Sequence, residues 1–346
     1  MSPAQDVSAL SPRRNLMKIS TYLRVLALVL LQSFSAMPWG NATAAEFPSK
    51  PIRLITPYAA GGSTDTLARI VGPKMSEALG VPVVVEAMPG ANGAMALSHL
   101  AKSAPDGYTM LITTASPIVV NPHTFPNVPY DPLKDFTHIS LVARSEAAFL
   151  VNPSIPANSL QQLIDLSKTR PIRIGVAGAG GQPELILAKI NTDSGAQFDV
   201  IPYNGGGPAI IDAVAGHVDG VLNDIAGNVG PMVKAGKLRS VAVLTSNDKS
   251  AMLPGAATLA NQSLPTQWEL RNWLVLLGPA NMPPAISEKL RKLVSDVVAD
   301  TGVIENLKTG SMVPFASEST AEAHEFITNE YMIFRDIQKQ TGVKVE

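Results

Sequence analysis

The chain has 346 residues, of which 46% are hydrophobic and 16% charged, and its formal net charge at pH 7 is −1. This length and apolar content provide a core for one large domain or two medium ones. Proteins that bind nucleic acid or an anionic membrane surface carry a strong positive balance, so we expect neither as a partner. The absence of cysteine excludes disulfides, thiolate nucleophiles, cysteine-ligated zinc and a lipid-modified N-terminal cysteine.

The N-terminal region has the pattern of a secretory signal peptide. Basic residues between 13 and 24 precede an apolar run at 25–31, and Ala42-Thr43-Ala44 then offers a small-x-small cleavage site. The run is far shorter than the roughly 20 residues that span a bilayer. We therefore expect residues 1–44 to be a signal peptide and the mature protein to be periplasmic. The pair Arg13-Arg14 leaves twin-arginine export open beside the Sec route.

After this region, predicted strands and helices alternate. The first predicted strands are 52–56, 81–86 and 108–113, with helices after the first strand and at 94–102. Pro73 should kink the first helix, and Gly80 should end it. Because 81–86 is apolar, we expect that strand to be buried on both faces of the sheet. The alternation predicts a mainly parallel sheet with helices on both faces.

A second alternating unit follows a proline-rich stretch at 121–136 and a long extended stretch at 138–151. Its predicted strands are 172–177, 198–202, 218–222 and 238–244. Its predicted helices are 160–167, one that begins near Pro183, and one that runs from Pro208 to Gly216. Another extended run at 270–277 precedes the predicted C-terminal helices, which are 285–300, 303–308 and 321–340. The last helix should turn five apolar residues toward a core, namely Ala323, Phe326, Ile327, Phe334 and Ile337.

Two alternating α/β units predict two lobes. The extended stretches near 138–151 and 268–277 fit a pair of crossings between them. The first lobe is then discontinuous, with residues 45–146 and 269–346, and the second lobe is 147–268. A ligand should lie between the lobes, where the carboxyl ends of both sheets meet.

Sequence motifs for catalysis are missing. Gly61-Gly62-Ser63-Thr64-Asp65 fails the G-x-S-x-G pattern at its last position, and no H-E-x-x-H occurs. The dinucleotide-like string at 178–183 has proline where the third glycine belongs. We predict no catalytic residue, no metal and no cofactor, and hence no enzyme. Catalytic groups need not be adjacent in sequence, so an exported enzyme acting on a carboxylate stays the alternative.

Glycine turns at 59–64, 178–182 and 204–207 are the candidate binding elements. Helix N-termini expose unpaired N–H groups, which hold an anion without a basic side chain. No Lys-Ser or Lys-Thr pair follows the glycines, so a carboxylate fits better than a nucleotide phosphate. Each turn could instead only connect a strand to a helix, and Asp65 could only complement its helix dipole. The candidate ligand-binding residues are Tyr58, Ala59, Ala60, Gly61, Gly62, Ser63, Thr64, Asp65, Thr114, Ser116, Gly178, Ala179, Gly180, Gly181, Gln182, Tyr203, Asn204, Gly205, Asn223 and Asp224.

Several motifs resemble one family. They are FPSKPIR at 47–53, the turn region 57–69, APDGYT at 104–109, YDPLKDF at 130–136, IPYNGGGPA at 201–209, AGHVD at 215–219 and KAGKLR at 234–239. Together they resemble the receptors of tripartite tricarboxylate transporters, the Bug-type periplasmic solute-binding proteins, over nearly all of the mature chain.

The resemblance implies a two-lobed periplasmic-binding-protein fold (type II-like) that closes on an organic acid. It also implies delivery of that acid to a two-component membrane permease, by a receptor we expect to be monomeric. In the family, main-chain amides of two loops hold one carboxylate, often with ordered water. On this sequence those loops are 58–65 and 178–182. A ligand-sensing subunit of a membrane signalling protein would share the same pocket and stays a second alternative.

Residues near the expected pocket depart from the family pattern in three places. Gly181 and Glu184 replace a serine and a histidine, and Asn223-Asp224 reverses the usual Asp-Asn order. Met88 replaces an arginine whose role we expect to be structural. These changes leave the group at the far end of the ligand unassigned.

Overall fold

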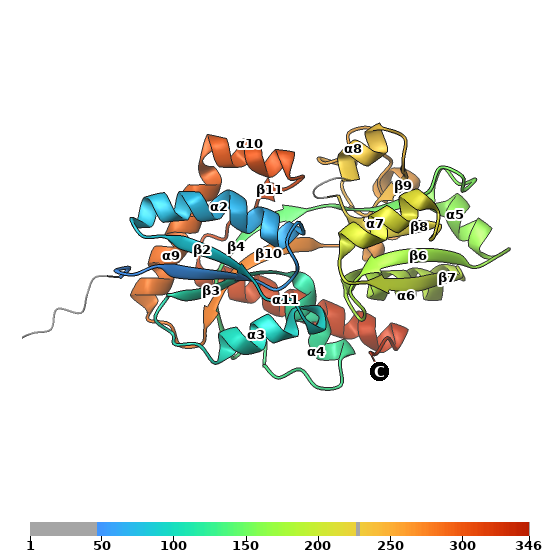
Figure 1. Ribbon diagram of the computed structural model, residues 1–346. Coiled ribbons are helices and arrows are strands. Elements are labelled where there is room, and N and C mark those ends of the chain that lie inside the picture. Colours follow the sequence, from blue (N-terminus) through green and yellow to red (C-terminus); the bar gives the residue numbers. More distant parts are fainter. Residues whose placement is uncertain (1–46, 226–228, 346) are drawn as a thin grey trace, which may run out of the picture. The chain divides into compact units, whose positions relative to one another are not determined.

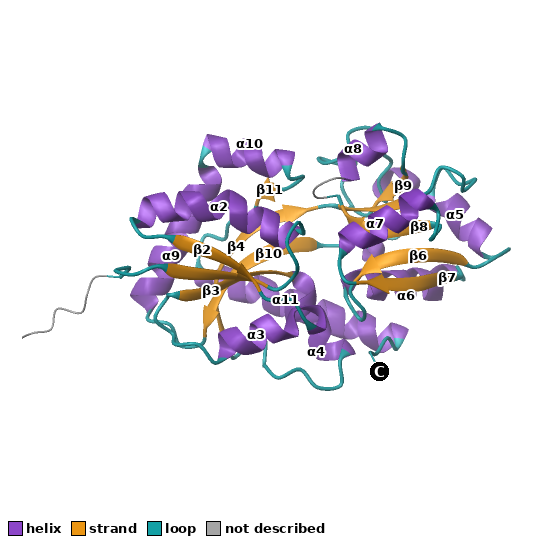
Figure 2. Ribbon diagram, in the orientation of Figure 1, coloured by secondary structure: helices purple, strands orange, loops and turns teal. Residues whose placement is uncertain are grey.

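A computed structural model describes residues 47–225 and 229–345. The expected signal peptide at 1–44 lies outside the described residues. Residues 47–346 form one compact unit that contains two sheets, each covered by helices on both faces (Figures 1 and 2). Among the described helices, none is long and apolar enough to cross a membrane.

The first sheet has six strands and mixes parallel with antiparallel pairs. Its order is β11 (Val313–Pro314), β4 (Phe136–Ser145), β10 (Asn272–Pro279), β3 (Thr109–Thr114), β1 (Ile52–Thr56) and β2 (Val83–Ala87). β1 pairs in parallel with β2 and β3, as the strand–helix alternation predicts, but the sheet is mixed rather than mainly parallel, and so is the second sheet. β10 pairs antiparallel with β3 and β4, because it returns from the second sheet rather than from a crossover helix.

Helices bury both faces of this first sheet. α2 (Ser63–Leu79), α9 (Pro284–Ala299) and α10 (Thr301–Thr309) pack on one apolar cluster. α3 (Ala94–Ala101), α4 (Asn121–Thr124) and α11 (Thr320–Thr341) lie on the other face, with a short π-helical turn at Ser116–Val120. Gly80 ends α2 in a left-handed conformation with φ 69°, as expected.

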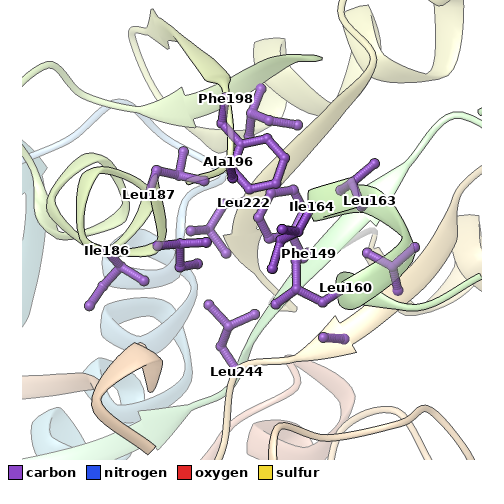
Figure 3. Close-up of a cluster of buried hydrophobic side chains, with 14 of the residues drawn as sticks. Phe149, Leu160, Leu163, Ile164, Ile186, Leu187, Ala196, Phe198, Leu222 and Leu244 are labelled. Carbon is purple, nitrogen blue, oxygen red and sulfur yellow. The ribbon is translucent and has the colours of Figure 1, made fainter. Parts of the chain in front are cut away.

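The second sheet has five strands. Its order is β7 (Phe198–Tyr203), β6 (Ile172–Ala177), β8 (Gly220–Asp224), β5 (Ala147–Val151) and β9 (Arg239–Val243). α5 (Leu160–Ser167) and α6 (Gln182–Ser194) cover one face. Their side chains meet Phe149, Phe198 and Leu222 in the core drawn in Figure 3. α7 (Gly206–Ala215) and α8 (Val229–Lys234) cover the other face.

The two sheets are joined at the extended stretches that the sequence singles out. β4 belongs to the first sheet and β5 to the second, with only Glu146 between them. Ser145 is paired with Asn272 at the start of β10, and the Asn272 side chain donates to Ser145 Oγ at 2.6 Å. The chain therefore crosses between the sheets twice, side by side. The last helix contacts the cores of both sheets, since Ile337 packs against a core cluster of each sheet.

Two sequence expectations about local structure are wrong. The strand expected to be buried on both faces is β2, which lies at the edge of its sheet, and Val84 there is 46% exposed. Its apolar residues pack on one side only, and strand order cannot be read from local hydrophobicity. The stretch expected to be a loop from residue 121 begins with the short helix α4.

Candidate functional site

The first glycine turn connects β1 to α2 and leaves the start of that helix open. Gly62 is the N-cap, with φ −80° and ψ 175°, and within the described residues no side chain caps this helix. Gly61 has φ 91°, and a Cβ built on it would meet no atom within 4 Å. The Gly61 N–H donates to Asp65 Oδ2 at 3.0 Å. The first turn of α2 therefore has no side-chain cap among the described residues, and the Asp65 carboxylate already accepts from the amide just before the N-cap.

The second glycine turn connects β6 to α6 and repeats this construction. Gly181 is the N-cap, with φ −82° and ψ 177°, close to the values at Gly62. The Gly180 N–H donates to Glu184 Oε2 at 2.7 Å, four residues further on, as in the first turn. Both lobes thus place a glycine N-cap and an acidic residue at the same positions of a helix start.

Asn92 lies between the two turns. Tyr58 Oη donates to Asn92 Oδ1 at 3.2 Å. A Cβ on Gly178 would come within 2.6 Å of the same oxygen, and one on Gly181 would lie 3.4 Å from Asn92 Nδ2. Asn92 is held in place by Asn121, since each amide donates to the other residue. The backbone at Gly178 can approach this side chain closely only because the glycine has no Cβ.

Further hydrogen bonds join the second turn to the first lobe. The Gln182 N–H donates to Ser116 Oγ at 3.1 Å, and Gln182 Nε2 donates to the Arg271 carbonyl at 3.0 Å. Thr124 Oγ1 donates to the Gly180 carbonyl at 2.9 Å. The described structure is therefore one in which the lobes meet along a polar seam.

Asp224 faces this seam from the end of β8. Burial raises the pKa of its carboxyl to about 7, against the hydrogen-bonding groups of Ser63, Asn272 and Ser145 beside it. Tyr58 is close to the same carboxyl, and its pKa is raised to about 12, chiefly by burial. An acid from the second lobe thus lies near Ser63, the first helical residue of α2, in the first lobe.

The pKa of Asp65 is shifted in the opposite direction to that of Asp224. Its side chain is nearly inaccessible and would by burial alone be harder to ionise. Arg69, whose Nε lies 2.9 Å from Oδ2, and the Gly61 N–H more than offset this, so the pKa of Asp65 is lowered. The simpler of the two interpretations of Asp65, a complement to its own helix start, accounts for these contacts.

The structure brings several of the candidate residues together, whereas others make their contacts elsewhere. Tyr58, Ser63, Thr114, Ser116, Gly178, Gly181, Gln182 and Asp224 all belong to the seam. Gly180 is instead packed against Val345 and Phe125. The Tyr203 hydroxyl bonds Asp212 at 2.8 Å, and its ring packs beside Gly175. The Asn223 side chain lies against Gly206 within the second lobe.

Sequence reasoning missed Asn92, Asn121, Ser145 and Asn272. Asn92 lies in a Pro-Gly-Ala-Asn-Gly string whose glycines signal a turn, and its backbone is left-handed with φ 47°. That string follows the second predicted strand, so it could have been grouped with the other glycine turns. Ser145 and Asn272 carry no local signal, because their importance comes from the pairing of two distant strands.

Comparison with known proteins assigns the family. The model of the tripartite tricarboxylate transporter family receptor matches residues 67–343. The chain belongs to this family. Protein BugT of Bordetella pertussis is 29% identical over 333 residues, which cover 95% of this chain and all of BugT. These matches confirm the resemblance found in the motifs, and the family is one of solute-binding receptors rather than enzymes.

Solved structures confirm the two-lobed periplasmic-binding-protein fold. Rpa4515 of R. palustris, solved with adipate, is 27% identical with a TM-score of 0.80, covering 86% of this chain and 99% of that one. MatC from Rhodopseudomonas palustris, solved with malate, is 26% identical with a TM-score of 0.77, covering 84% and 99%. Among the described residues of this chain, no cluster of His, Asp or Glu is suited to a metal ion.

Proposed function

We propose that this protein is a monomeric periplasmic receptor that binds a small organic carboxylate between its lobes and delivers it to a two-component membrane permease. The carrying observation is the pair of matched glycine N-caps, one from each lobe, that flank Asn92. The partial positive charge of two helix starts favours a carboxylate there. Relatives solved with adipate and malate support the same ligand class.

In this proposal the first turn makes the main contacts with the ligand. The amides of Gly62 and Ser63 bind one carboxylate, and the side-chain amide of Asn92, to which Tyr58 donates, hydrogen-bonds it from the side. The crossings near Ser145 and Asn272 act as hinges between lobes bounded near residues 146 and 268. Residues 1–44 direct export and are removed, with Sec and twin-arginine routes both compatible.

A thermal-shift screen of adipate, malate and citrate tests the ligand class. A bound acid at 100 times its dissociation constant should raise the free energy of unfolding by about 2.7 kcal/mol. Adipamide, which has the same length as adipate without its charges, should give no shift. A shift with a sugar or a peptide, and none with any organic acid, would contradict the proposal.

Asn92→Asp tests the site, because it places a negative charge between the turns without changing side-chain size. We expect it to weaken adipate or malate binding about 100-fold, as like charges repel in a partly desolvated cleft. Asn158→Asp on the exposed surface before α5 is the matched control and should leave affinity unchanged. Equal affinities of both variants would move the binding site away from the turns.

The alternative of an exported enzyme is tested by the fate of the bound acid. After prolonged incubation with the protein, the acid should be recovered unaltered in its NMR spectrum. Conversion would favour the enzyme. Capture of a two-component permease from membranes, rather than of a membrane kinase, separates transport from sensing.

A further inference from the structure

A crevice lies beside the strands that connect the two lobes, and residues of both lobes line it. Its volume is about 310 Å³, and we call it the hinge crevice. Neighbouring residues on a strand point to opposite faces. Ser145 and Asn272 bond one another beside Asp224, so the next directly opposed pair, Arg144 and Trp273, points to the other face of the crossing. Ser145 and Asn272 also line the hinge crevice, so it borders the seam there, but no residue of the glycine turns lines it.

Aromatic rings form one wall of the hinge crevice. Phe326 packs edge-to-face against Trp273 and against Phe315, each at 5.5 Å between ring centroids. The Arg144 guanidinium lies over the Phe315 ring, 5.3 Å from its centroid. A flat or apolar group can pack on such a wall with a cation beside it.

The hinge crevice is lined by three acidic and three basic residues, which differ in the partners they have. Each acidic residue already has donors. Glu146 accepts from Ser250 Oγ and from the Ala251 N–H, and Glu269 accepts from Ser246. Arg271 pairs with Glu330 at 3.0 Å and with Glu269 at 3.6 Å.

Two further basic residues lie at the crevice. Arg144 and Lys249 are both exposed and line it from different lobes. In the part of the chain that the structure describes, neither forms an ion pair, and the recorded partner of Arg144 is an aromatic ring.

We propose that the hinge crevice is a second binding site, for a small organic anion with an aromatic body. Its carboxylate binds Arg144 and Lys249, and its ring packs on Phe315 and Phe326. An anion is favoured over a cation because the acids are satisfied and the two basic residues are not. An aromatic body is favoured over a polar one because three aromatic rings meet at the wall.

Calorimetric titration with benzoate tests this site, with benzamide as the uncharged probe. We expect saturable benzoate binding to the intact protein and about tenfold weaker binding of benzamide. Arg144→Gln and Lys249→Gln should each weaken benzoate binding by about tenfold. Lys237→Gln, an exposed lysine of the same lobe as Lys249, is the matched control and should have no effect.

The seam variant Asn92→Asp separates the two sites. It should leave benzoate affinity unchanged, while Lys249→Gln should leave adipate or malate affinity unchanged. The proposal is overturned if benzoate shows no saturable binding, or if Asn92→Asp abolishes benzoate binding while both crevice variants retain it. Lys249 lies on an exposed loop, so Lys249→Gln still tests the site if Arg144→Gln fails to fold.

Discussion

The turn that begins α2 and the turn that begins α6 share one construction, but their surroundings differ. Both have a glycine N-cap with nearly the same backbone angles and an acid that accepts from the N–H of the preceding glycine. Gly61 has no neighbour within 4 Å of a Cβ position, whereas the same position at Gly180 would overlap Val345. One turn is open, and the other is packed against the first lobe.

This difference suggests a division of roles between similar elements. The second turn is anchored through Thr124 and Ser116 of the first lobe, so it fixes how the lobes meet. The first turn has open space at the Cβ position of Gly61, with the Asp224 carboxyl beside Ser63. Local sequence makes both helix starts, but packing decides which of them stays available.

Among the substitutions that test this difference between the turns, Gly178→Ala should have the largest effect on stability. The left-handed backbone there, with φ 79°, costs a non-glycine residue about 1–2 kcal/mol, and the new Cβ would crowd Asn92 Oδ1 at 2.6 Å. We expect a loss of about 3 kcal/mol in the free energy of unfolding, measured by urea denaturation, together with weaker carboxylate binding.

Gly195→Ala is the matched control for that substitution. Gly195 also has a positive φ, 70°, but no atom lies within 4 Å of its Cβ position. It should cost about 1 kcal/mol and leave binding unchanged. If both variants lose the same stability, the close approach of Gly178 to Asn92 contributes nothing, and the seam is not packed as described.

Asp65→Asn and Glu184→Gln compare the two acids directly. We expect Asp65→Asn to cost about 2 kcal/mol, because it weakens charge-assisted bonds to Gly61 and Arg69 at a nearly buried site. Glu184→Gln should cost less than about 1 kcal/mol, since Glu184 is only partly buried and bonds a single amide. Urea denaturation of both variants at neutral pH measures the difference, and equal costs would contradict it.

Much of the fold could be predicted because its signals are local. β6 and α5 match their predicted ranges fully, and helix starts at glycine or proline positions follow from backbone preferences. The edge position of β2 could not be predicted, because strand order depends on which distant segments pair. The same reason hides Ser145 and Asn272, which become neighbours only through the pairing of β4 with β10.

For the site, the glycine turns could be located but their hydrogen bonds could not. The pattern of strand, glycine turn and helix predicts free amides at both helix starts, yet Gly61 and Gly180 already donate to side chains four residues further on. Whether an acid folds back onto its own turn depends on side-chain rotamers and on neighbours such as Arg69. The packing of Gly180 against the C-terminal segment is likewise a contact between distant parts of the chain.

The smallest expected effect concerns the pH dependence of the two acids that flank the first turn. The lowered pKa of Asp65 means that its contribution to stability is present above the unfolded-state value near 3.8 and is lost as pH falls below it. The raised pKa of Asp224, about 7, gives the opposite sign. Between about pH 4 and 7 the folded state holds a proton that the unfolded state has released, so stability falls as pH rises.

Asp224→Asn should remove the fall in stability between about pH 4 and 7 and leave the loss of stability at acid pH that is due to Asp65. Because Asp224 retains partial solvent access, we expect a difference on the order of 1 kcal/mol between about pH 5 and pH 8 in the unsubstituted protein. Asp65→Asn should keep that difference, but its free energy of unfolding should fall less as the pH drops below about 4. Denaturation series at several pH values distinguish the two acids. An unchanged slope in Asp224→Asn would mean that Asp224 is already ionised beside Ser63, and that the first turn faces a charge in the second lobe.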